Sequence, residues 1–430
     1  MRIGKRTALL GAVSLLTAVG VSCAIAVPAN AEPVSPNPAS ESLEAPLVGV
    51  GSDTIQDLFT GLTHSVSDLT TGKAVFASYD AFGTAAKPLS AQITPRVLGS
   101  TFDRPGGSGP GLDALRSAVE GGTHTVPNNG GTVVLKGSDV QFARSSGAQT
   151  ITPGGRYAQI PIAIDAVTYV TNGGTGGTQV PNGIPLGGAP TGAPGTVASP
   201  APLTLSNIFA GNGYLSDGTH NFFSGSGNSS DAGFPKLHVY VPQPGSGTYK
   251  FWQPALGLTA LGNGVLQTFN GSPTIEHDGT PINGDPLAIE PFSIAQWIAQ
   301  SHAPTLNSQY STGGVIQDRR NNVVLNNVGS VAPTVAGVLN TAFPIARPVF
   351  VDVEYAQLKI NPYLKAAFVD DSSFALTSSI YDAVNPGNFV TSVITDFGFA
   401  KIPAGGFTPT TNGVPHVSFK QGDADDYRFN

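Results

Sequence analysis

The sequence predicts an α/β protein made of two lobes. Three short apolar stretches each lead into a glycine-containing turn and then into residues with helical spacing, which is typical of strand–loop–helix units. Two longer apolar stretches, 157–171 and 345–355, are suited to strands that cross between lobes. The chain has 430 residues, which is long enough for two lobes.

The clearest of the three units spans residues 237–256. Leu237, Val239 and Val241 alternate with more polar positions, as in a half-buried strand, and the glycine turn 245–248 follows. A strand, a glycine turn and a helix start gather unpaired N–H groups and the positive end of the helix dipole. The unit therefore predicts an anion site, although a GSGT turn is also typical of an ordinary exposed loop.

Two further units have the same arrangement. The apolar stretch 47–51 is followed by residues 52–54, which are predicted to cap a helix. In the other unit, Arg104 precedes a glycine loop that contains Ser108, and a helix is expected after it. The unit that begins at residue 47 is also compatible with a well-capped core helix.

The turn 143–147 is a further candidate for anion contacts. Arg144, Ser145 and Ser146 follow an apolar stretch and offer hydrogen-bond donors without a competing carboxylate. The alternative is an exposed turn with a solvated arginine.

The N-terminal segment is expected to be a secretory signal rather than part of the fold. Residues 1–31 combine a basic start, an apolar stretch and small residues before a cleavage point, and 32–44 is a Pro- and Ser-rich disordered lead-in. The mature protein is therefore expected to be secreted, extracellular or associated with the cell surface. Cys23, the one cysteine, lies in a poor lipoprotein box, so its lipidation is the lesser alternative. Cleavage after residue 31 leaves no disulfide and no thiolate metal site.

Charge and composition exclude several partners. The net charge is −7, and removal of three basic residues with the signal segment brings it to about −10. Such a field repels phosphate and nucleic acid, so anion selectivity has to come from local donors, and no basic cluster suggests a nucleic-acid groove. The mature part has no apolar stretch of membrane-spanning length. The seven histidines lack paired-ligand spacing, so neither a metal nor a cofactor is predicted.

The chain order suggests how the lobes are assembled. Lobe 1 is predicted to comprise residues 45–164 and 345–430, and lobe 2 residues 165–344. Within lobe 2, the Gly- and Pro-rich stretch 172–200 is expected to be a long surface insertion rather than core. The last helix is expected at 389–397.

Six motifs then occur in a characteristic order. GSDT, a serine-bearing glycine loop, FARSS, GSGT, EHDG and SIAQWIAQ follow one another along the chain. Each motif is weak alone, but in this order they resemble the phosphate-binding proteins of bacterial phosphate ABC transporters, most closely a secreted actinobacterial branch. The resemblance covers roughly residues 48–403. It implies a type 2 periplasmic-binding-protein fold with two α/β lobes, a central cleft and two crossover segments.

The resemblance also implies a ligand site in the cleft, built from both lobes. Together with the basic residues noted above, the candidate ligand-binding residues are Ser52, Thr54, Arg104, Ser108, Arg144, Ser145, Ser146, Ser246, Gly247 and Thr248.

Two positions depart from the family pattern. Ser146 stands where the family has an aspartate that accepts a proton from hydrogen phosphate, and Pro242 stands where it has an arginine. Arg144 and Arg104 are the nearest candidates for the missing cation. Without the acceptor, selectivity against fully ionised oxyanions such as sulfate is expected to weaken.

These observations lead to one main hypothesis and two alternatives. The main one is a monomeric, non-enzymatic secreted protein that captures phosphate or a similar tetrahedral oxyanion and hands it to an ABC permease. The second is a cell-surface or extracellular binding module that does not serve transport. The third is a secreted phosphatase that uses Ser246 with His277 and Asp278, although the chain lacks the expected nucleophile elbow.

Overall fold

The computed structural model describes residues 3–5, 45–68, 74–83, 88–173, 179–227, 231–369, 391–411, 414–415 and 417–430. The predicted signal segment 1–31, with Cys23, and the lead-in 32–44 lie outside these residues, except for β1 (Ile3–Lys5), which pairs antiparallel with β3 (Val66–Asp68). Among the helices formed by the described residues, none is both long and apolar enough to cross a membrane.

One large mixed sheet organises the molecule. Its strands are, in spatial order, β15 (Val265–Leu266), β14 (His238–Tyr240), β18 (Ala288–Ser293), β10 (Tyr157–Asn172), β22 (Ala346–Glu354), β9 (Phe142–Ser145), β2 (Leu47–Gly51) and β4 (Phe76–Ser78), while β19 (Val323–Leu325) and β25 (Arg428–Phe429) also pair with β10.

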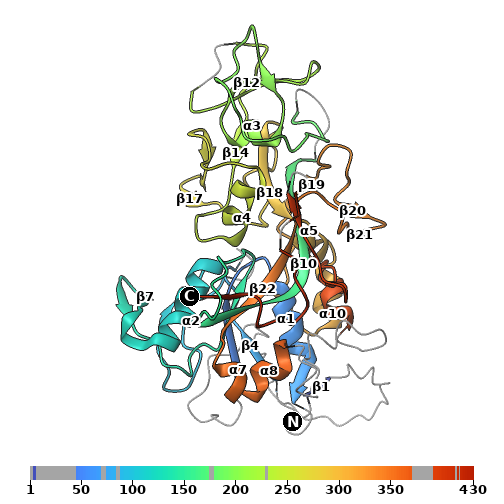
Figure 1. Ribbon diagram of the computed structural model, residues 1–430. Helices are drawn as coiled ribbons and strands as arrows, with labels where there is room; N and C mark the ends of the chain where they lie inside the picture. Colours follow the sequence, from blue (N-terminus) through green and yellow to red (C-terminus); the bar gives the residue numbers. More distant parts are fainter. Residues whose placement is uncertain are drawn as a thin grey trace, which may run out of the picture.

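The two long strands at the centre of this sheet run through both halves of the molecule. β10 and β22 are antiparallel, paired from Tyr157 opposite Glu354 to Ala166 opposite Ala346, and β10 continues beyond this pairing to β18. In Figure 1 they pass between an upper half with β12, β14 and α4 and a lower half with α1, α2 and β4. The predicted α/β class, with two lobes and two crossover segments, is confirmed. The predicted lobe boundaries fall within β10 and just before β22.

The three strand–loop–helix units form three helices. α1 (Gln56–Ser65) follows β2, α2 (Ser108–Glu120) follows the second glycine loop, and α4 (Gly247–Ala255) follows β14. The other helices are α3 (Leu205–Phe209), α5 (Ile294–Ser301), α6 (Ala303–Gln309), α7 (Gln357–Ile360), α8 (Pro362–Phe368), α10 (Thr391–Asp396) and the 3₁₀ turn η2 (Gly121–Thr123). α10 lies where the last helix was predicted, and residues 389–390 of that prediction are outside the described part.

Short strands form small peripheral sheets. These strands are β5 (Gln92–Ile93), β6 (Phe102–Asp103), β7 (Val126–Asn128), β8 (Gly131–Val133), β11 (Ala201–Pro202), β12 (Gly213–Ser216), β13 (Asn221–Ser224), β16 (Thr268–Phe269), β17 (Ser272–Pro273), β20 (Thr334–Val335), β21 (Val338–Leu339), β23 (Thr410–Thr411) and β24 (Val414–Pro415).

An aromatic cluster fixes α1 against the sheet. Phe59 of α1 packs on Phe142 of β9 with ring centroids 5.2 Å apart, and Phe142 packs equally closely on Phe368 of α8, at 5.2 Å. All three side chains are fully buried. A Cβ atom at Gly49 would lie 2.0 Å from the Phe142 ring, so β2 needs glycine at this position. Because buried aromatic side chains contribute strongly to the core, the N-terminal end of α1 is held in a fixed place.

The Gly- and Pro-rich stretch differs from its prediction. Asn172 is the last residue of β10, and residues 179–200 form no helix or strand, which agrees with the expected loop. However, Val180, Ile184 and Leu186 are buried in the main core, so the expectation that the stretch lies outside the core is wrong for this part. The Tyr169 hydroxyl donates to the Pro181 carbonyl at 2.8 Å and accepts from the Ile184 N–H at 3.0 Å. The apolar residues interspersed among the glycines and prolines dock the segment.

A buried carboxyl group in β22 makes stability depend on pH. Asp352 Oδ1 accepts a 2.9 Å hydrogen bond from Gln159, and Oδ2 has no partner in the described part of the chain. Burial raises the pKa of Asp352 to about 7. The unfolded chain ionises at this position near pH 4, so the native state loses stability as the pH rises from about 4 to about 7.

We therefore expect Asp352→Asn to be more stable than the wild-type protein. Its advantage should grow between pH 4 and pH 7 and level off above, with a maximum of about 4 kcal/mol, since one pKa unit corresponds to about 1.4 kcal/mol. Guanidinium unfolding at pH 5 and pH 8 measures this. An advantage that is the same at both pH values would contradict the assignment.

Candidate functional site

The glycine loop before α2 and the glycine loop before α4 touch where the two lobes meet. The Gly109 N–H donates to the Gly245 carbonyl at 3.2 Å, and the Gln243 side chain donates to the Gly106 carbonyl at 3.2 Å. Gly107 has a φ of 137°, and a Cβ atom there would lie 2.8 Å from the Gly245 oxygen. The two loops therefore approach backbone to backbone, which places the starts of α2 and α4 together.

Serine hydroxyls gather beside this contact. Ser52 donates to the Ser146 hydroxyl at 3.0 Å, and Ser108 lies 3.4 Å from the same hydroxyl and accepts from the Ser146 N–H at 3.1 Å. Gly247 faces them so closely that a Cβ atom would lie 2.2 Å from Ser146 Oγ. The structure thus brings together four of the candidate residues, whereas the Ser145 hydroxyl bonds to the Gly147 carbonyl within its own turn.

A buried carboxylate lies between hydroxyls of the two lobes. Thr54, from lobe 1, donates to Glu276 Oε1 at 2.6 Å, and Ser246, from lobe 2, donates to Glu276 Oε2. All three side chains are fully buried. Burial opposes the ionisation of Glu276, but the positive charge of Arg347 and the Ser246 hydrogen bond lower its pKa below the usual range. An anion of the protein itself therefore occupies the point where donors of both lobes meet.

The helix caps explain why Thr54 is available for this contact. We predicted that residues 52–54 cap α1, but its N-cap residue is Ile55 and no side chain caps it, so that prediction is wrong. Thr54 instead directs its hydroxyl across the lobe boundary. Ser246 does cap α4 and accepts the Tyr249 N–H at 3.1 Å, while its own proton goes to Glu276.

The cation of the site is Arg347. It lies directly opposite Asp165 in the pairing of the crossing strands, and their closest atoms are 3.0 Å apart. The same guanidinium donates to the Thr248 hydroxyl at 2.7 Å and to the Ser146 carbonyl at 3.0 Å. Asp165 also accepts from the Ser293 hydroxyl at 2.8 Å. One buried ion pair thus connects both crossing strands to the turn that contains Ser146 and to the start of α4 at Thr248.

The two arginines proposed from sequence have other partners. Arg144 is fully buried, and its guanidinium donates to backbone or hydroxyl oxygens of residues 51–52 and 78–79, at 2.5–3.1 Å. Arg104 donates to carbonyl oxygens in the segment 80–90 at 2.7 and 2.8 Å. Both groups therefore hold loops in place, and these contacts do not support the prediction that one of them supplies the cation.

Sequence reasoning missed Glu276 and Arg347. Glu276 belongs to the EHDG motif, which was quoted for the resemblance without a role. Arg347 was considered only as part of an apolar strand. For Arg347, the available signal was the presence of charged residues inside the apolar crossing stretches, Asp165 in one and Arg347, Asp352 and Glu354 in the other, because charged residues are rarely buried unless they are paired.

Asp53 and His277 adjoin Glu276 and are also fully buried. Burial, followed by the negative charge of Glu276, raises the pKa of Asp53 well above its usual range. Burial lowers the pKa of His277 to about 3, so the imidazole is neutral at neutral pH and keeps a free lone pair.

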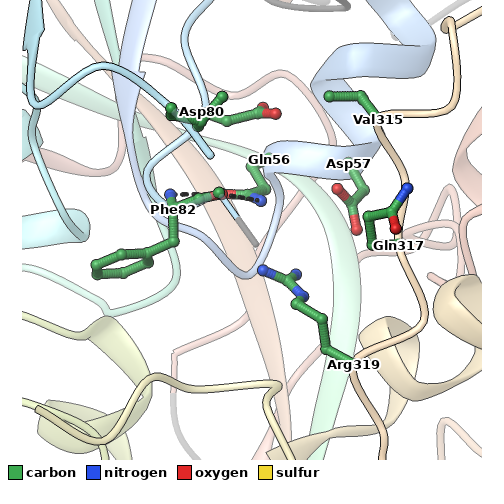
Figure 2. A pocket seen from close by; sticks show the side chains of 9 residues that line it. Gln56, Asp57, Asp80, Phe82, Val315, Gln317 and Arg319 are labelled. Atoms are coloured by element: carbon green, nitrogen blue, oxygen red, sulfur yellow. Dashed lines mark hydrogen bonds between the residues drawn. The ribbon is translucent and has the colours of Figure 1, made fainter. Parts of the chain in front are cut away.

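A small pocket lies nearby, between the lobes. It is lined by the start of α1, by residues 80–83 of lobe 1 and by the lobe 2 segment 315–319. Figure 2 shows Arg319 reaching toward Gln56 and Asp57 at the start of α1. Burial raises the pKa of Asp57, and the positive charge of Arg319 partly offsets this. The pocket marks the lobe boundary close to the buried site.

Comparisons with known proteins give distant structural similarity only. No protein-family model matches the chain. No curated protein matches it either. Among solved structures, an ABC-type phosphate transport receptor from Vibrio cholerae is 12% identical with a TM-score of 0.41, and the match covers 83% of this chain and 100% of that one. A putative phosphate ABC transporter substrate-binding protein with bound phosphate from Clostridium perfringens is 13% identical with a TM-score of 0.42, over 83% and 99% of the two chains. Because both TM-scores are below 0.5, we derive nothing further from this similarity, and the actinobacterial branch stays a prediction.

For the ion pair between Asp165 and Arg347, we expect that the effects of the two substitutions on the free energy of unfolding are far from additive. Arg347→Met should lower the free energy of unfolding by about 3–5 kcal/mol, because Asp165 is then buried without a counter-charge. The double variant Arg347→Met/Asp165→Asn should recover most of this loss, since the amide carries no charge and still accepts hydrogen bonds. Chemical denaturation measures all three proteins.

The matched control is Arg156→Met, which removes an exposed ion pair with Glu354 at 3.2 Å. It should change stability by less than about 1 kcal/mol. A double variant that is as unstable as Arg347→Met would show that the loss has another origin.

Proposed function

We propose that this protein is a non-enzymatic solute-binding protein that captures phosphate or a similar tetrahedral oxyanion between its lobes. The observation that carries the proposal is the pair of hydroxyls, Thr54 and Ser246, that reach one buried carboxylate from opposite lobes. Hydroxyl donors that hold the Glu276 carboxylate can equally hold an oxyanion, because both ligands are acceptor-only anions of small size. The ligand would take the place of Glu276 when the lobes separate.

The surroundings of these hydroxyls favour an anion as well. The starts of α2 and α4 meet there, and helix N-termini stabilise negative charge. The serine group of Ser52, Ser108 and Ser146 adds further donors. Arg347 is balanced by Asp165, so the affinity would rest mainly on neutral donors rather than on net positive charge.

The contacts of His277 and Asp278 favour binding over hydrolysis. Asp278 accepts from the Thr280 N–H at 2.9 Å and so bonds within its own turn. His277 Nδ1 lies 3.9 Å from Asp53, and Ser246 donates to Glu276 rather than to an imidazole. A serine nucleophile needs a histidine base within hydrogen-bond reach, which these three residues do not form.

We also propose that the protein acts outside the cytoplasm as a monomer and delivers its ligand to an ABC permease. The support for this is the signal-like N-terminal sequence and the order of the six motifs. A binding module without transport is the alternative on the same scaffold. Phosphate uptake that is unchanged after deletion of the gene would favour the alternative.

Calorimetric titration tests the binding proposal. The protein should bind one phosphate per chain, and Thr54→Val and Ser246→Ala should each weaken binding about 10- to 100-fold, because a hydrogen bond to a charged group contributes about 1.5–3 kcal/mol. Thr123→Val, which removes an exposed hydroxyl at the far end of α2, serves as the control and should bind like the wild-type protein. The absence of both heat and thermal stabilisation in millimolar phosphate would reject the proposal.

A second titration tests the role of Glu276 as an internal competitor. Glu276→Ala should bind phosphate at least about tenfold more tightly than the wild-type protein, because the ligand no longer has to displace a bound carboxylate. Asp217→Ala changes the net charge equally at an exposed site of lobe 2 and should have no such effect. Weaker binding by Glu276→Ala would instead make Glu276 part of the ligand's own contacts. Both titrations are done with a chelator present.

A further inference from the structure

A second cluster adjoins the hydroxyl site and has a different chemistry. Asp53 precedes α1 in lobe 1, whereas Glu276 and His277 belong to the lobe 2 segment before β18. Each offers one ligand atom, and these atoms all lie within 4.8 Å of one another. None of the three side chains is exposed to solvent.

The side chains of Asp53 and His277 lack hydrogen-bond partners within the described part of the chain, whereas Glu276 accepts from Thr54 and Ser246. Neither carboxylate oxygen of Asp53 and neither ring nitrogen of His277 has a hydrogen-bond partner among the described residues. The imidazole lies between the two carboxylates, with Nδ1 3.9 Å from Asp53 Oδ2 and Nε2 3.8 Å from Glu276 Oε1. These separations are too long for hydrogen bonds. Burying polar groups without partners is unfavourable, so the arrangement points to a ligand that satisfies Asp53 and His277 and is also in reach of Glu276.

We propose that Asp53, Glu276 and His277 bind a divalent transition-metal cation and so link the two lobes. Two carboxylate oxygens and one imidazole nitrogen are a donor set suited to Zn²⁺, whereas Ca²⁺ and Mg²⁺ prefer oxygen alone. Ligand atoms about 2.0–2.2 Å from a tetrahedral Zn²⁺ lie about 3.3–3.6 Å apart. With one ligand atom from each residue, the three atoms now lie within 4.8 Å of one another, so binding requires them to move inward by up to about 1.5 Å.

The cation would also offset the negative charge of Glu276 and stabilise the ionised form of the facing Asp53 carboxyl group. Three protein ligands leave one position of a tetrahedral ion open. The Thr54 and Ser246 hydroxyls contact Glu276, one of the three proposed ligands. The site goes beyond the proposed anion binding, since two of its three ligands have no part in it. Because one ligand comes from lobe 1 and two from lobe 2, the bound cation favours lobe contact.

The test is Zn²⁺ binding by the chelator-stripped protein in phosphate-free buffer, so that its outcome is independent of anion binding. Calorimetry and elemental analysis should give one Zn²⁺ per chain, and Zn²⁺ should raise the melting temperature. Asp53→Asn and His277→Gln should each weaken Zn²⁺ binding at least about tenfold. Ca²⁺ should bind at least about tenfold more weakly than Zn²⁺.

The control is His238→Gln, which removes an exposed histidine paired with Asp285 at 2.6 Å in the same lobe. It should keep both the affinity and the rise in melting temperature. Since the buried substitutions can change stability by themselves, the quantity compared is the rise caused by Zn²⁺ in each variant. No stoichiometric binding by the wild-type protein, or an undiminished rise in both Asp53→Asn and His277→Gln, would overturn the proposal.

Discussion

The buried ion pair between Asp165 and Arg347 is the constraint on which the site depends. It lies where β10 and β22 face each other, so it fixes the register of the two strands that connect the lobes. Its remaining hydrogen bonds reach Ser146 of one lobe and Thr248 of the other. A charged pair at this depth is tolerated only when its hydrogen-bonding capacity is satisfied. The guanidinium of Arg347 therefore couples the pairing of β10 and β22 to the positions of the Ser146 turn and of Thr248 at the start of α4.

The second feature is that the donors converge on an acceptor supplied by the chain. Thr54 and Ser246 come from elements far apart in sequence, and Glu276 accepts hydrogen bonds from both. This contact stabilises the observed arrangement, since the hydroxyls would otherwise be buried unpaired. Under the proposed function, an external oxyanion would have to bind more favourably than this internal contact, which would set a threshold on its affinity. The proposed function therefore depends on the difference in free energy between Glu276 and an external oxyanion as the acceptor for these two hydroxyls.

The sequence was informative where local rules apply. The three strand–loop–helix units and both crossing strands were predictable from spacing, and four of the candidate residues, Ser52, Ser108, Ser146 and Gly247, lie close together in the structure. Arg347, Glu276 and the Asp53–His277 contact were not, because they depend on which distant segments meet. Residues 180–186 were missed for a similar reason: a Gly- and Pro-rich composition indicates turns but does not reveal that interspersed apolar residues dock into the core.

A crystal structure of the protein with phosphate tests the central claim most directly. We expect a phosphate oxygen within hydrogen-bond distance of both the Thr54 and Ser246 hydroxyls, with the Glu276 carboxylate moved away from them. Phosphate bound elsewhere, with Glu276 still accepting from both hydroxyls, would contradict the account.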